Sequence, residues 1–231
     1  MNIHIGNDFG KIYDKFIQLP LYTIFNIKEN IKFINYHNCM EIIRYRPYEK
    51  LKDFIPNEND LVLDIGAQFC DYSIILDKKY KAKVIAFEPL PQNYIEAFDN
   101  IAINNSSVKL YNFGIGEDNY NIELNIDHKM ISIRETKDKI IIPIKTIDSF
   151  NFSNVKLIKL DVEGYEFKAL NGMINTLIKY GPKLIIETHT SVLFKLCSDF
   201  LNKLNYKLIW ENNKRKGIGI FDEVKETFWC Q

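Results

Sequence analysis

Cysteine is scarce in this sequence. Four cysteines occur among 231 residues, at Cys39, Cys70, Cys197 and Cys230. They share no short spacing, which argues against a zinc knuckle and a disulfide framework, and we interpret them as reduced thiols. A chain of this length can bury a core without cross-links, and it favours one large domain, or one domain with an appendage, over two independent folds.

An excess of either charge is also absent, because 30 Lys and Arg residues balance 30 Asp and Glu residues. The chain therefore has no surplus of cations for long-range attraction to a polyphosphate. We expect neither nucleic acid nor an anionic membrane surface as a partner.

Long apolar stretches are missing as well. The longest stretch without a charged side chain, residues 16–27, has twelve residues, fewer than the about 18 needed to span a bilayer. The first eight residues show neither the basic leader nor the apolar segment of a secretory signal. These features predict no membrane span and a cytoplasmic protein.

From about residue 59 onward, short runs rich in β-branched residues alternate with longer stretches of helical period. This alternation is typical of an α/β fold in which helices cover both faces of a mostly parallel sheet. Strands are expected at 61–64, 84–87, 108–111, 155–160 and 184–187, with a final hairpin-like pair at 206–210 and 217–221 joined by polar residues 211–216. Helices are expected at 71–80, 92–103, 163–180 and 192–204.

Two segments depart from this rhythm. Residues 120–144 alternate polar and apolar side chains, which predicts an antiparallel insert beside the site. Residues 1–58 are rich in aromatic residues and isoleucine and are punctuated by prolines. We expect 1–58 to form a small cap that selects the substrate, and 59–231 to form the main domain.

The polar residues that follow the predicted strands point to a ligand site, because ligands of an open parallel sheet bind beyond the carboxyl ends of its strands. Asp64 ends the first strand and is followed by Gly66, where the missing side chain lets a ligand approach the backbone. The turn lacks the other glycines of a dinucleotide-binding loop, and no phosphate-binding G-x-x-x-x-G-K-[ST] loop occurs.

A second carboxylate, Glu88, follows the next strand, where an acid can accept the hydroxyls of a ribose. Together, Asp64 and Glu88 favour a nucleoside without phosphates. S-adenosylmethionine is such a ligand, because its ammonium and sulfonium groups favour carboxylates and carbonyls. An ordinary turn glycine with solvated carboxylates is the alternative.

Six blocks of sequence follow one another in a fixed order between residues 61 and 189. They are LDIGA at 63–67, AFEPLP at 86–91 with Asn93, NFGIG at 112–116, TID at 146–148, IKLDVEGYE at 158–166 and IETH at 186–189. This ordered set resembles the FkbM family of S-adenosylmethionine-dependent methyltransferases, and its K-x-D-V-E-G-x-E block is the most specific part.

The resemblance implies a Rossmann-like class I methyltransferase fold, with a seven-stranded sheet that ends in an antiparallel hairpin. It also implies an O-methyltransferase that acts on a hydroxyl of a sugar, a glycan or another small molecule. The cofactor-binding residues that we expect from the turns and from the resemblance are Asp64, Gly66, Ala67, Gln68, Glu88, Pro89, Asn112, Phe113, Gly114 and Asp161. The loop at 112–114 is expected near the adenine.

Methyl transfer to a hydroxyl benefits from a general base. His189 follows the fifth predicted strand beside Asp161, and Glu187 shares its side of that strand. We expect His189 to be the base, Glu187 to orient it and Asp161 to face the transferred methyl group. A histidine that bonds a loop carbonyl is the alternative.

The acids around this position allow two further interpretations. For Glu166 we expect only a favourable interaction with the N-terminus of its helix. Asp161 and Glu163 could instead share a divalent cation with Glu187 or His189, because hard cations bind clustered oxygens.

Other functions stay open at this point. Gln68 and Cys70 stand where the family usually has asparagine and glycine. A non-catalytic binding module that retains the methyltransferase fold is therefore the alternative to an enzyme. Methylation of RNA or protein is disfavoured by the neutral charge and by the absence of a basic aromatic tract.

Overall fold

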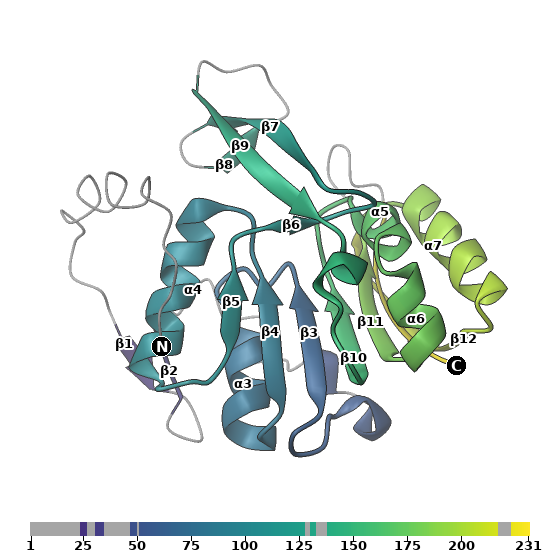
Figure 1. The fold of residues 1–231 in the computed structure, drawn as a ribbon, viewed down its shortest axis with the longest axis horizontal. Helices are drawn as coiled ribbons and strands as arrows, with labels where there is room; N and C mark the ends of the chain where they lie inside the picture. The colour runs from purple at the N-terminus through teal and green to yellow at the C-terminus, as the bar shows by residue number, and fades with distance from the viewer. Residues whose placement is uncertain are drawn as a thin grey trace.

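A seven-stranded sheet forms the centre of the molecule (Figure 1). The computed structural model describes residues 24–26, 31–34, 47–49, 51–127, 130–132, 138–216 and 223–231. Along the sheet the strands are β12 (Lys207–Lys216), β13 (Glu223–Cys230), β11 (Lys183–Thr188), β10 (Val155–Leu160), β3 (Leu61–Ile65), β4 (Lys83–Phe87) and β5 (Lys109–Tyr111). Strands β11, β10, β3, β4 and β5 are parallel, and the β12–β13 hairpin is antiparallel. The expected α/β sheet is confirmed.

Helices cover both faces of this sheet. The helices are α3 (Asp71–Tyr80), α4 (Pro91–Ile103), α5 (Glu166–Asn171), α6 (Ile174–Tyr180) and α7 (Ser191–Lys203). Neighbouring strand residues alternate between two cores: Val62 packs on the side of α3 and α4, whereas Leu63 packs on the side of α5, α6 and α7. No helix in the described ranges is long and apolar enough to cross a membrane.

The expected single helix at 163–180 is wrong in two respects. The helix begins at Glu166, because Glu163 and Gly164 have φ angles of 52° and 105° and form a turn. It also breaks after α5, at Gly172, which packs so closely on the backbone that a Cβ atom there would lie 1.8 Å from the carbonyl oxygen of Gly116. Asp148 then accepts the backbone N–H groups of the first turn of α6, each at 2.9 Å.

The terminal hairpin is shifted relative to the expected strands. The polar residues 211–216, expected as a connection, continue β12 and pair with β13. Polar side chains are tolerated there because β12 is an edge strand. Strand β13 begins at Glu223, whereas the expected strand at 217–221 lies outside the described residues.

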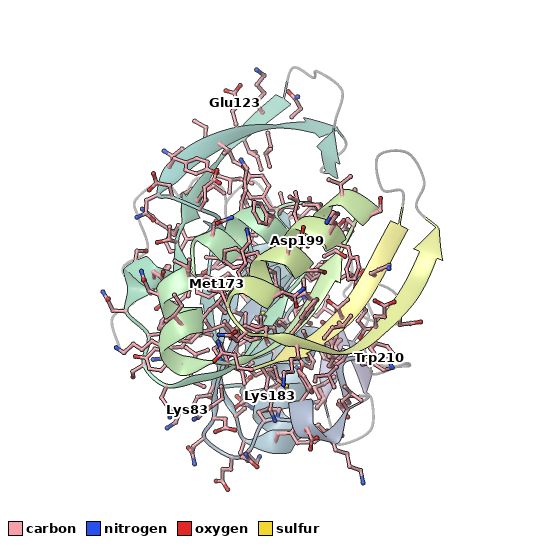
Figure 2. All side chains as sticks on the ribbon, turned by 90° about the vertical axis from the view of Figure 1, so that its right-hand side faces the viewer. Lys83, Glu123, Met173, Lys183, Asp199 and Trp210 are labelled. Atoms are coloured by element: carbon pink, nitrogen blue, oxygen red, sulfur yellow. The ribbon has the colours of Figure 1, made fainter. Side chains whose placement is uncertain are left out.

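A second sheet extends beyond the carboxyl ends of the parallel strands (Figure 1). It consists of β6 (Gly114–Ile115), β7 (Tyr120–Asp127), β8 (Met130–Ser132) and β9 (Asp138–Lys145), and β7 pairs with β9 in antiparallel register. In Figure 2, Glu123 of β7 lies at the end of the molecule opposite Lys83 and Lys183, the first residues of β4 and β11.

One face of this sheet is buried. Ile142 is 1% exposed, whereas the neighbouring Ile141 is 68% exposed.

Parts of the N-terminal segment pack against α4. Strands β1 (Ile24–Asn26) and β2 (Lys32–Ile34) pair with each other, and the amide oxygen of Asn100 in α4 accepts the backbone N–H of Ile34 at 2.8 Å. Two 3-10 turns, η2 (Pro47–Glu49) and η3 (Lys52–Phe54), precede β3. Most of the segment before residue 47 lies outside the described residues, so the cap at 1–58 stays a prediction.

Candidate active site

A cavity of about 540 Å³ opens beyond the carboxyl ends of β3, β4 and β10. Its apolar wall comes from the second sheet and includes Ile122, Leu124, Ile142 and Ile144. Nine of the expected cofactor residues line it: Asp64, Gly66, Ala67, Gln68, Glu88, Pro89, Phe113, Gly114 and Asp161. The turns that follow the parallel strands therefore meet at one site.

The tenth expected cofactor residue, Asn112, has a different position. It is outside the cavity lining, and its side-chain amide donates to the carbonyl oxygens of Glu88 and Pro89 at 2.8 and 3.0 Å. Asn112 thus holds the turn after β4 in place. The next residue, Phe113, does line the cavity, and its ring stacks on Tyr111 with 6.0 Å between centroids.

Gly66 is required by backbone packing rather than by an open approach to a ligand. Its φ angle is +80°, and a Cβ atom at this position would lie 1.7 Å from the carbonyl oxygen of Asp161. Gly66 thus allows the turn after β3 to lie directly against the end of β10.

Glu88 is nearly enclosed, with 4% exposure. Its two carboxylate oxygens accept the backbone N–H groups of Gln68 and Leu90, both at 2.9 Å. Burial raises the pKa of Glu88 to about 7, although these hydrogen bonds oppose the shift. The carboxylate is thus fixed at the cavity wall and keeps lone pairs for a ligand hydroxyl.

Lys159 joins the turn after β3 to the end of β10, a role that we had not expected. Its ammonium group donates to the carbonyl oxygen of Gly66 at 2.7 Å and lies 3.5 Å from Asp64 and 3.7 Å from Asp161. Burial alone would lower the pKa of Lys159, but the surrounding carboxylates raise it well above its usual range. Its position in the K-x-D-V-E-G-x-E block was the feature of the sequence that could have indicated this role.

His189 lies behind the cavity wall and does not line the cavity. We had expected it to reach the acceptor directly as the base. It is 2% exposed, and its Nε2 atom lies 3.2 Å from Glu163 and 3.7 Å from Asp161, which both line the cavity. Burial alone would lower the pKa of His189, but Glu166, Asp161 and Glu163 raise it to about 9. The imidazole is therefore charged at neutral pH, which disfavours it as a base.

Glu166 orients this imidazole, a role that we had expected of Glu187. Glu166 is fully buried, and the Nδ1 atom of His189 lies 2.9 Å from its Oε1 atom. The expectation that Glu166 serves only the helix N-terminus is therefore wrong. Glu187 lines the cavity, and its expected role in orienting His189 stays a prediction.

Tyr48 reaches the site from the N-terminal segment, where no sequence motif indicated it. It is 3% exposed and lines the cavity, and its hydroxyl lies 3.5 Å from the Oδ2 atom of Asp161. Its ring packs edge-on against Tyr72 with 4.9 Å between centroids. The contact between Tyr48 and Asp161 joins segments 113 residues apart in the chain.

The acids near Asp161 could also bind a cation. Asp161, Glu187 and His189 each place one ligand atom within 4.8 Å of the others. The spacing suits a shared divalent cation, which stays a prediction.

The burial of Glu88 and Asp71 predicts an unusual pH dependence of stability. Burial raises the pKa of each to about 7, so between about pH 4 and 7 the folded protein holds more protons than the unfolded chain, and its unfolding free energy falls as pH rises. We expect the melting temperature to rise from pH 7.5 to 5.5 by more in the wild type than in a Glu88→Gln/Asp71→Asn variant. Circular dichroism melts measure both slopes, and equal slopes would contradict this expectation.

Comparison with known proteins agrees with this architecture. The family model described as the methyltransferase FkbM domain matches residues 64–208. Hexuronic acid methyltransferase AglP of Haloferax volcanii is 27% identical over 142 residues, which cover 58% of each chain. Methyltransferase 1 of Beauveria bassiana is 22% identical over 157 residues, which cover 54% of this chain and 63% of the relative. The chain thus spans about three fifths of the length of these curated relatives.

Solved structures show the same fold. An FkbM methyltransferase from Methylobacillus flagellatus superposes with a TM-score of 0.55 at 18% identity, covering 81% of this chain and 47% of the other. TYW2 of Pyrococcus horikoshii, solved in complex with MeSAdo, has a TM-score of 0.50 at 13% identity and covers 90% of this chain and 70% of the other. Since the family model matches more than half of the sequence, this chain belongs to the FkbM family of methyltransferases.

Proposed function

We propose that this protein is an S-adenosylmethionine-dependent O-methyltransferase that acts on a hydroxyl of a sugar, a glycan or another small molecule. The charge of the cavity supports this proposal most directly. Among the described residues that line it, the acids Asp64, Asp71, Glu88, Asp161, Glu163 and Glu187 surround a single cationic side chain, Lys159. Such a wall favours a ligand with cationic groups and repels phosphates.

The residues near β4 and β5 suit the nucleoside part of this cofactor. Glu88 accepts ribose hydroxyls with a carboxylate that backbone N–H groups already hold in place. Phe113 offers an aromatic face to the adenine, and its stacking on Tyr111 keeps that face oriented. These two side chains therefore fit a nucleoside without phosphates.

S-Adenosylmethionine, when bound, supplies an electrophilic methyl group on a sulfonium. Asp161 then accepts the proton of the acceptor hydroxyl, because its carboxylate faces the cavity at the end of β10. Lys159, His189 and Tyr48 surround this carboxylate at 3.5 to 3.7 Å and hold it in position. Glu187 adds a second carboxylate to the same wall.

The acceptor is proposed to be a sugar. The relative from Haloferax volcanii is named as a hexuronic acid methyltransferase, and it is 27% identical to this chain. Tyr165 lines the cavity and provides an aromatic face on which a sugar ring could pack.

The alternative, a binding module without transfer, draws less support from the structure. Cys70 is fully buried in the core beside α3, and the side chain of Gln68 is exposed at the rim of the cavity. Neither replacement therefore fills the space that the cofactor needs.

Calorimetry with three ligands tests the cofactor. We expect S-adenosylmethionine and S-adenosylhomocysteine to bind, and ATP to bind at least about 100-fold more weakly because its phosphates meet the acidic wall. Absence of S-adenosylmethionine binding at millimolar concentration, or tighter binding of ATP, would contradict the proposal.

Mass spectrometry on a panel of acceptors tests the reaction. Incubation with S-adenosylmethionine and uronic acids, neutral sugars or amines should yield S-adenosylhomocysteine together with an O-methylated product. A product methylated at nitrogen or carbon would refute O-methylation. Cofactor binding without turnover on any acceptor would favour the binding module.

A further inference from the structure

Asp71 is a buried carboxylate at the cavity with an oxygen that the protein leaves unused. It begins α3, is 7% exposed and lines the cavity. Its Oδ1 atom accepts the backbone N–H of Tyr72 at 2.8 Å. The backbone N–H of Asp71 also interacts with its own carboxylate. No other described residue donates a hydrogen bond to Oδ2, and no ion pair among the described residues includes Asp71.

Interaction with the helix N-terminus does not account for this residue. An acid in the first turn of an exposed helix stabilises the helix through its dipole, and this benefit is available without burial. Burying a carboxylate is unfavourable, and burial raises the pKa of Asp71 to about 7 although the nearby charge of Lys159 opposes the shift. A ligand that donates to Oδ2 would offset this cost.

The position of Asp71 identifies the part of the ligand that it meets. Glu88 and Phe113, proposed for the nucleoside, follow β4 and β5, whereas Asp71 follows β3, which lies between β4 and β10. Asp71 is also close enough to Lys159 for its charge to raise the pKa of that side chain. This part of the wall thus presents a carboxylate and an ammonium group near each other, which matches the two charges of an α-amino acid.

We propose that Asp71 binds the α-ammonium group of the methionine part of the cofactor, with an ammonium N–H donating to Oδ2. This inference rests on the proposed function. The ammonium group is favoured over the sulfonium because Oδ2 needs a hydrogen-bond donor, and a sulfonium has no N–H or O–H to donate.

A cycle of two proteins and three ligands tests the inference by calorimetry. The proteins are the wild type and Asp71→Asn, and the ligands are S-adenosylmethionine, S-adenosylhomocysteine and S-adenosylhomocysteine that lacks the α-amino group. We expect Asp71→Asn to bind the first two about 10- to 100-fold more weakly than the wild type does. The ligand without the amino group should bind both proteins with equal affinity.

Asp77→Asn is the matched control, because Asp77 lies on the same helix but bonds Ser106 and Ser107 away from the cavity. It should bind all three ligands as the wild type does. Melting temperatures of each variant show whether the fold is retained, and Asp71→Ala provides a second removal of the carboxylate.

Each other outcome has a distinct meaning. Equal losses for all three ligands, or no loss for any, would overturn the inference and leave the proposed function intact. A loss for S-adenosylmethionine alone would assign Asp71 to the sulfonium and also overturn it. Failure of the wild type to bind any of the ligands would refute the proposed function itself, and the inference with it.

Discussion

Asp161→Asn is expected to lower the rate of methyl transfer by about 10²- to 10⁴-fold, the range that a general base contributes. Asparagine keeps the shape of the side chain but cannot accept the proton of the acceptor hydroxyl as a carboxylate can. Cofactor affinity should change by less than about 10-fold, because the substitution removes the charge of only one of the several acids around the site. Single-turnover formation of S-adenosylhomocysteine measures the rate, and calorimetry measures the affinity.

Asp199→Asn serves as the control for this substitution. Asp199 lies on α7 (Figure 2). It forms an exposed ion pair with Lys195, and its substitution should have no effect on the rate. If Asp161→Asn were as fast as the wild type while His189→Gln was inactive, the base would be His189, as the sequence suggested. The position of His189 behind Asp161 favours the opposite result.

Gly66→Ala is expected to destabilise the protein by about 2 to 5 kcal/mol, since a left-handed backbone and overpacking each contribute. The added Cβ atom would lie 1.7 Å from the carbonyl oxygen of Asp161, so the ends of β3 and β10 must separate. That movement would also pull the Gly66 carbonyl away from Lys159. Urea unfolding measures the loss of stability.

Gly164→Ala separates the two contributions. Gly164 also has a positive φ angle, +105°, but a Cβ atom there meets no atom within 4 Å. Only the backbone strain remains, so the expected loss is about 1 to 2 kcal/mol. Equal losses at Gly66 and Gly164 would show that the contact with Asp161 contributes nothing.

Elements that depend on local sequence were predicted well. The helix expected at 71–80 has the same bounds as α3, because its apolar spacing is a property of adjacent turns. The strands of the terminal hairpin were predicted at the wrong positions, because the polar residues 211–216 pair at the sheet edge. An edge strand does not require alternating polar and apolar side chains. The break at Gly172 depends on the backbone of Gly116, which no local pattern reveals.

In the site, too, the residues that directly follow strands were predicted, whereas those placed by tertiary contacts were missed. Asp64 and Glu88 follow their strands directly, so the topology of a parallel sheet was sufficient to bring them to one cavity. The role of Glu166 was missed because a first-turn glutamate is common on exposed helices, and only the packing of α5 against β11 buries it on His189. Tyr48 was missed because its contact with Asp161 spans 113 residues.

By itself, the sequence determined the alternation of strands and helices, the order of the six blocks and the acids at the strand ends, because these depend on neighbouring residues and on strand direction. Tertiary packing alone decided that Asp161 faces the cavity, that His189 lies behind it and that the carboxylate of Asp71 is buried at the cavity wall. Burial and hydrogen bonding depend on atoms distant in the chain, and those atoms meet only when the helices pack on the sheet.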